Sequence, residues 1–144
     1  MFQAITIANA FIAFSDPEKG DIISNLKVQK LLYYAQGIYL AVYNEPLFEE
    51  DIIKWQYGPV VPAVYSSLKR YGSEAIPVDD AFDFSVFNKN QMDVLQEINM
   101  VFGQFSAIRL MNMTHQEPPY NNTLLRGVIT HQELIKYFST QLED

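Results

Sequence analysis

The segment that most constrains the fold of this chain is residues 25–43, NLKVQKLLYYAQGIYLAVY, because it is helical in pattern and apolar on more than one side. Ser24 stands before it as a plausible N-cap. One face of the helix carries a broad apolar stripe, which comprises Leu26, Leu31, Tyr34, Ala35, Ile38 and Val42. Lys27, Lys30 and Tyr33 lie toward its other faces. The second half is apolar all round, so we expect this helix to run through the middle of the molecule.

The remaining pattern predicts five more helices, near residues 3–14, 63–70, 91–103, 107–113 and 130–138. Thr130 and Glu133 match a capping box at the start of the last one. Two consecutive prolines, Pro118 and Pro119, are expected to break helical structure before it. Alternating apolar residues predict a short strand pair near residues 52–57. The expected fold is therefore mainly α, a compact single domain of about six helices spanning residues 1–144.

Residues 73–87 form an acidic connector, which three phenylalanines are expected to hold against the core.

The composition fits a globular chain, with 49% apolar and 19% charged residues. There is no cysteine, which excludes disulfide scaffolds, thiolate zinc sites, iron–sulfur clusters and cysteine nucleophiles. No apolar run approaches the ~20 residues of a membrane span, and the start of the chain does not resemble a signal peptide. We therefore expect a cytoplasmic protein with no membrane partner.

The charge balance narrows the choice of partners. The chain carries 17 acidic and 10 basic residues, a formal charge of −7. Binding to a phosphate backbone depends on Lys and Arg, so nucleic acid is disfavoured as a partner. An acidic surface instead favours solubility and attraction toward a basic protein.

A search for catalytic patterns is mostly negative. The sequence has no P-loop, no dinucleotide fingerprint, no nucleophile elbow and no H-E-x-x-H motif. His115 and Glu117 could contribute to a metal site or a hydrolase, but two ligands in one loop are few for a metal. Thr114, His115 and Glu117 are better explained as groups that satisfy the backbone at a helix end. No catalytic residue, metal or cofactor is predicted, and His131 is assigned to solvent.

Tyrosine and tryptophan are concentrated in the first half of the chain, and both are enriched at binding hot spots. Most of these rings are expected to pack in the core. A smaller set of basic and aromatic residues is predicted to form a contact surface for a partner, namely Lys27, Lys30, Tyr33, Lys54, Trp55 and Tyr57.

Four ordered segments of the sequence resemble the Panacea domain. They are LKVQKLLYYAQG at residues 26–37, PLF at 46–48, WQYGPVVPAVY at 55–65 and MTHQEP at 113–118. The resemblance extends over residues 5–138. It implies a structural role for the turn at Gly58 and Pro59, and for a loop motif made of Thr114, His115, Glu117 and Pro118. Two departures are present: Pro119-Tyr120 follows Pro118 where the family has tryptophan, and residues 54–57 read KWQY in place of an AWKY-type run.

The resemblance also implies a function. The family includes phage-associated GepA-type proteins and SocA-like proteolytic adaptors, and many members are the antitoxin of a toxin–antitoxin pair. The implied partners are a cognate protein toxin and, in the adaptor branch, an ATP-dependent protease that degrades the delivered toxin. The alternatives are a phage or mobile-element protein with another host target, a hydrolase around His115 and Glu117, and a DNA-binding regulator, which the charge disfavours.

Overall fold

The computed structural model describes residues 1–142 and confirms the mainly α prediction. Within these residues there are seven α-helices and one three-stranded antiparallel sheet. The helices are α1 (Ala4–Phe14), α2 (Asn25–Tyr43), α3 (Pro62–Leu68), α4 (Lys89–Phe102), α5 (Ala107–Thr114), α6 (Pro118–Asn121) and α7 (His131–Phe138). The strands are β1 (Ile52–Trp55), β2 (Gly58–Val60) and β3 (Val128–Ile129), in the order β2–β1–β3.

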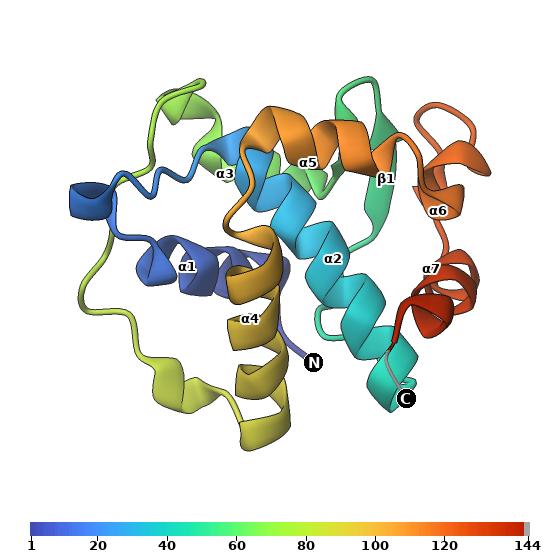
Figure 1. Cartoon of the computed structure of the whole chain (residues 1–144), viewed down its shortest axis with the longest axis horizontal. Helices are drawn as coiled ribbons and strands as arrows, with labels where there is room; N and C mark the ends of the chain where they lie inside the picture. Colours follow the sequence, from blue (N-terminus) through green and yellow to red (C-terminus); the bar gives the residue numbers. More distant parts are fainter. Residues whose placement is uncertain (143–144) are drawn as a thin grey trace.

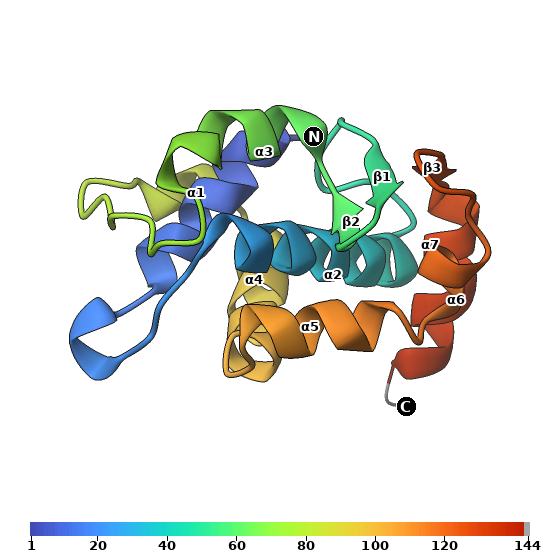
Figure 2. The same cartoon turned by 90° about the horizontal axis from the view of Figure 1, so that it is seen from above.

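Helix α2 is the axis of the molecule, as its sequence predicts. It crosses the centre of Figure 1, and Figure 2 shows the hairpin and α3 on one side of it with α5 on the other. Five other helices and one strand of the hairpin pack against it, namely α1, α3, α4, α5, α7 and β2. The polar residues of α2 are therefore enclosed together with the apolar ones, among them Asn25, Gln29, Lys30 and Gln36.

Side-chain caps fix most of the helix starts. The Ser24 hydroxyl accepts a hydrogen bond from the Lys27 amide at 3.3 Å, which confirms the predicted cap of α2. Thr130 likewise caps α7. Helix α4 begins at Lys89, two residues earlier than predicted, because Asn88 and Gln91 form a capping box that the apolar pattern does not reveal.

The two prolines at the end of the loop motif start a helix instead of ending helical structure. Pro118 and Pro119 occupy the first turn of α6, where a missing amide hydrogen costs nothing. The predicted break is present at residues 115–117, but the prolines were wrongly expected to cause it. The count of helices therefore rises from six to seven among residues 1–142.

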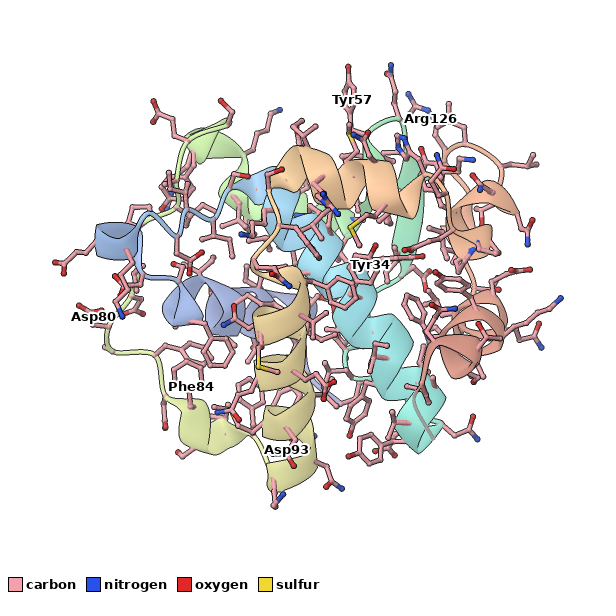
Figure 3. The ribbon with its side chains drawn as sticks, in the orientation of Figure 1. Tyr34, Tyr57, Asp80, Phe84, Asp93 and Arg126 are labelled. Atoms are coloured by element: carbon pink, nitrogen blue, oxygen red, sulfur yellow. The ribbon has the colours of Figure 1, made fainter. Side chains whose placement is uncertain are left out.

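The predicted strand pair is confirmed as the β1–β2 hairpin, in which Trp55 pairs with Gly58. The third strand was not predicted, since β3 has only two residues and joins β1 across more than 70 positions of sequence. The connector 73–87 is anchored as expected. Phe84 stacks on Phe14 with ring centroids 4.9 Å apart, while the acidic Asp80 lies at the exposed edge of the connector (Figure 3).

The helices between residues 1 and 142 are too short or too polar to span a bilayer.

Candidate functional site

The first half of α2 holds the β1–β2 hairpin and the start of α3 (Pro62–Leu68) through three buried polar side chains. The Lys30 Nζ donates to the Pro59 carbonyl at 3.0 Å, the Gln29 Oε1 accepts from the Val61 amide at 2.9 Å, and the Asn25 Nδ2 donates to the Tyr65 carbonyl at 3.2 Å. Two of the sequence segments that resemble the family thus meet here. Polar side chains of α2 build its contact with the hairpin and with the start of α3.

Lys30 is fully buried against the glycine of the hairpin turn. Gly58 has a φ of +108°, and a Cβ there would lie 2.6 Å from the Lys30 Cε. Only glycine fits both the backbone angle and the space. Burial lowers the pKa of the Lys30 amine from 10.5 to about 7. The family turn at Gly58 and Pro59 therefore depends on a buried lysine whose amine donates to the Pro59 carbonyl.

Glu117 is held by two adjacent tyrosines of α2. The Tyr33 hydroxyl donates to its Oε1 at 2.9 Å and the Tyr34 hydroxyl to its Oε2 at 2.8 Å. Burial raises the pKa of Glu117 to about 6, although both hydrogen bonds act in the opposite direction. Burial first, and then the Glu117 carboxylate, raise the pKa of each tyrosine far above its ordinary value. These three side chains join the loop motif to the middle of α2.

Gln36 makes the matching contact with the segment at residues 46–48. Its Oε1 accepts from the Leu47 amide at 2.8 Å and from the Phe48 amide at 3.2 Å, and its Nε2 donates to the Phe48 carbonyl at 2.9 Å. The three family segments outside α2, at residues 46–48, 55–65 and 113–118, are therefore each hydrogen-bonded to α2 through buried side chains.

His115 does not use its side chain as predicted. Thr114 does bond the backbone at the helix end, since its hydroxyl donates to the Met111 carbonyl at 2.7 Å. The His115 ring stacks on Tyr120 at 4.7 Å, and its buried Nε2 has no hydrogen-bond partner among the described residues. Burial lowers the pKa of His115, and the positive charges of Lys30 and Lys54 lower it further. No group of three His, Cys, Asp or Glu residues suited to a metal occurs in the described part of the chain.

Tyr120 takes the place of the aromatic residue that the loop motif was expected to carry. Its hydroxyl donates to the Trp55 carbonyl at 2.7 Å, and the Lys54 Nζ lies 4.3 Å from its ring centroid. Although the sequence departs from the family pattern here, Tyr120 still provides an aromatic ring, and its hydroxyl donates to β1.

The six residues predicted to form a contact surface are divided between the interior and the surface. Lys30 and Tyr33 are completely buried, and Lys27 is buried with its Nζ 2.6 Å from the Gly103 carbonyl. The placement of these three on a surface was wrong, because the faces of α2 outside its apolar stripe are also covered by neighbours. Lys54 and Trp55 are half-buried. Tyr57 is 61% exposed and projects from the hairpin turn at the edge of the molecule (Figure 3).

A groove that the sequence does not indicate lies between the second half of α2, α4 and α7. Its volume is about 800 Å³, and Tyr34 and Glu117 line it together with mostly apolar side chains. Figure 3 shows Tyr34 between α4 and α7. Val42 and Val101, on two of its walls, are 46% and 37% exposed. The apolar residues of two predicted helices were the available signal, but a single sequence shows neither that Val42 and Val101 stay exposed nor that these helices face each other.

Comparison of the sequence with known proteins shows the family to which the chain belongs. The model of the antitoxin SocA-like Panacea domain matches residues 28–120. The chain belongs to this family. It is also 31% identical over 103 residues to the antitoxin SocA of Caulobacter vibrioides, an alignment that covers 65% of this chain and 55% of the relative. The chain thus spans about half the length of that relative, and no solved structure matches it.

The segment matched to the SocA-like Panacea domain runs from α2 to α6 and contains most of the buried polar contacts described above. Lys30, Tyr33, Tyr34 and Glu117 all lie within it. Helix α7, which forms one wall of the groove, lies outside it. The motifs that mark the family in this sequence therefore position α2 relative to the hairpin and the loop, and α7 adds a further wall to that framework.

Proposed function

We propose that this chain is an antitoxin, which binds a protein toxin and neutralises it. The observation that carries the proposal is the match to the SocA-like Panacea family over residues 28–120, together with the similarity to a protein named as an antitoxin. The formal charge of −7 supports attraction toward a basic toxin.

The buried polar groups favour binding over hydrolysis. Both oxygens of Glu117 accept hydrogen bonds from tyrosine hydroxyls, which hold the carboxylate in one position. The His115 ring stacks on Tyr120, and no hydrogen bond joins it to Glu117 among the described residues. Hydrolysis of this kind needs an acid and a base that are positioned to act together. The arrangement therefore fits a structural role for the loop motif better than a hydrolytic one.

The hairpin turn is the proposed point of contact that the sequence suggested. Tyr57 is exposed, and Lys54 and Trp55 stand beside it on β1. A tyrosine offers a large contact area at a small loss of conformational entropy, which suits it to an interface. Bound toxin is then neutralised by coverage of its active surface or by delivery to an ATP-dependent protease.

Co-expression tests the proposal. The gene next to this one is expressed alone and together with it, and growth and co-purification are measured. The proposal expects growth arrest by the neighbour alone, relief by this chain, and a stable complex of the two proteins. A rescued toxin that persists in the cell indicates coverage, and one that disappears indicates proteolysis. A harmless neighbour, or two proteins that never associate, contradicts the antitoxin role.

The contribution of the hairpin is tested on the same complex. Tyr57→Ala should weaken the complex by more than ~1 kcal/mol if Tyr57 is a hot spot, with little change in the stability of the free chain. The control is Ile22→Ala, since Ile22 is similarly exposed, at 57% against 61%, and belongs to the connection between α1 and α2, which lies away from the hairpin in Figure 2. Equal affinities of the two variants and the unmodified chain would remove Tyr57 from the interface.

A further inference from the structure

We propose that the groove between α2, α4 and α7 binds an apolar segment of the toxin that carries a lysine or arginine side chain. This inference rests on the proposed function, because it names the surface through which the toxin is held. It adds a second contact to the one proposed at the hairpin turn.

The groove is large enough and apolar enough to hold a segment of another protein. At about 800 Å³ it has space for several side chains. Its walls include Ile38 and Val42 of α2, Val101 of α4 and Tyr137 of α7. Val42 and Val101 remain 46% and 37% exposed. Exposed apolar side chains gathered on a concave surface are typical of a protein interaction site.

The charges that line the groove are all acidic. They are Asp93 and Glu97 on α4 and Glu117 at the start of α6. Asp93 already has a partner, because the Lys89 Nζ lies 2.8 Å from its carboxylate. Glu97 and Glu117 form no salt bridge within residues 1–142. The groove therefore combines apolar walls with two carboxylates that lack a cation among the described residues.

Glu117 is the more informative of these two carboxylates. Its oxygens accept hydrogen bonds from Tyr33 and Tyr34, and Tyr34 lines the groove beside it. The two hydroxyls hold the carboxylate in one position. A cation brought by a partner would meet an oriented negative charge in surroundings of low dielectric, where the attraction is stronger than in water. Burial alone disfavours this charge, so a bound cation would also offset that cost.

The acidic lining selects the toxin over a second copy of this chain as the occupant. A second copy carries the same formal charge of −7 and would bring like charge to the groove. A toxin segment with apolar side chains and one Lys or Arg matches both the walls and the carboxylates. This is the chemistry by which the toxin would be recognised.

The test compares charged substitutions inside and outside the groove in the complex of the full chain with the protein from the neighbouring gene. Val42→Lys is paired with Val86→Lys, because Val42 and Val86 are 46% and 51% exposed and only Val42 lies in the groove. Glu97→Lys is paired with Glu74→Lys, where both side chains are exposed and only Glu97 lies in the groove. Circular dichroism and thermal unfolding verify that each variant folds.

The proposal expects the Kd of the complex to rise at least tenfold for Val42→Lys and at least fivefold for Glu97→Lys, and to change less than twofold for the two controls. Equal binding by all four variants overturns the groove as the docking site while the antitoxin role stands. A dimer of the free chain that Val42→Lys dissociates would show a second copy as the occupant and overturn the proposal. Absence of binding by the unmodified chain overturns both proposals, because the occupant named here is the toxin.

Discussion

Replacement of Lys30 by methionine should reveal the cost of burying an amine at the centre of this fold. Methionine is apolar and similarly long, so it fills much of the space beside Gly58 without an ionisable group. The variant also removes the donor to the Pro59 carbonyl, a loss of about 1–3 kcal/mol that does not vary with pH. The pH-dependent part of the difference therefore reports on the amine alone.

The magnitude follows from the pKa of Lys30 in the folded protein. A decrease from 10.5 to about 7 corresponds to about 5 kcal/mol, at 1.36 kcal/mol for each pH unit. Between pH 7 and 10.5 the unfolded chain retains the proton that the folded protein has lost, so the free energy of unfolding rises with pH. From about pH 7 to about pH 9 this gain is about 2 kcal/mol, and the variant Lys30→Met lacks it.

The assay is urea unfolding of the unmodified chain and of Lys30→Met at about pH 7 and about pH 9. Contributions from the other titrating groups cancel in the difference between the two proteins. The unmodified chain should gain about 2 kcal/mol relative to the variant over this interval. Lys69→Met is the control, because Lys69 is exposed and its loss should leave the difference nearly constant. Parallel pH profiles for the unmodified chain and Lys30→Met would refute the reasoning and show that the buried amine stays charged.

Two further predictions concern the other end of the network and the packing of α7. Burial raises the pKa of Glu117 from 4.5 to about 6. The free energy of unfolding of the unmodified chain should therefore fall by about 2 kcal/mol relative to that of Glu117→Gln between about pH 4.5 and pH 7. Urea unfolding that shows no such loss would contradict the burial of this charge. A Cβ on Gly37 would overlap the ring of Phe138, so Gly37→Ala should reduce the free energy of unfolding by about 1–3 kcal/mol. Gly37→Ala should cost less when it is introduced into Phe138→Leu, and an equal cost in both backgrounds would exclude the clash as its cause.

The sequence was most informative where local signals determine the structure. The apolar pattern of α2 predicted its central position, and Ser24 and Thr130 marked helix starts that the structure confirms. Caps depend on residues a few positions apart, so a single sequence can reveal them. The start of α6 at Pro118 was misjudged because a proline can either end a helix or begin one.

The site was less predictable because its contacts join residues far apart in sequence. Lys30 bonds a carbonyl 29 positions away, and Tyr33 bonds a carboxylate 84 positions away. Lysine is rarely buried, so composition favoured a surface position that the structure does not support. The groove has walls from three helices, and no short pattern indicates that these helices meet. The resemblance to the Panacea domain identified the segments involved, but not the contacts that they make.

The most direct test of the account is the growth of cells that express the neighbouring gene with and without this chain, followed by titration of the two purified proteins. We expect growth arrest that this chain relieves, and saturable binding that Val42→Lys weakens and Val86→Lys does not. Arrest that persists in the presence of this chain, or two proteins that show no binding, would contradict its central claim.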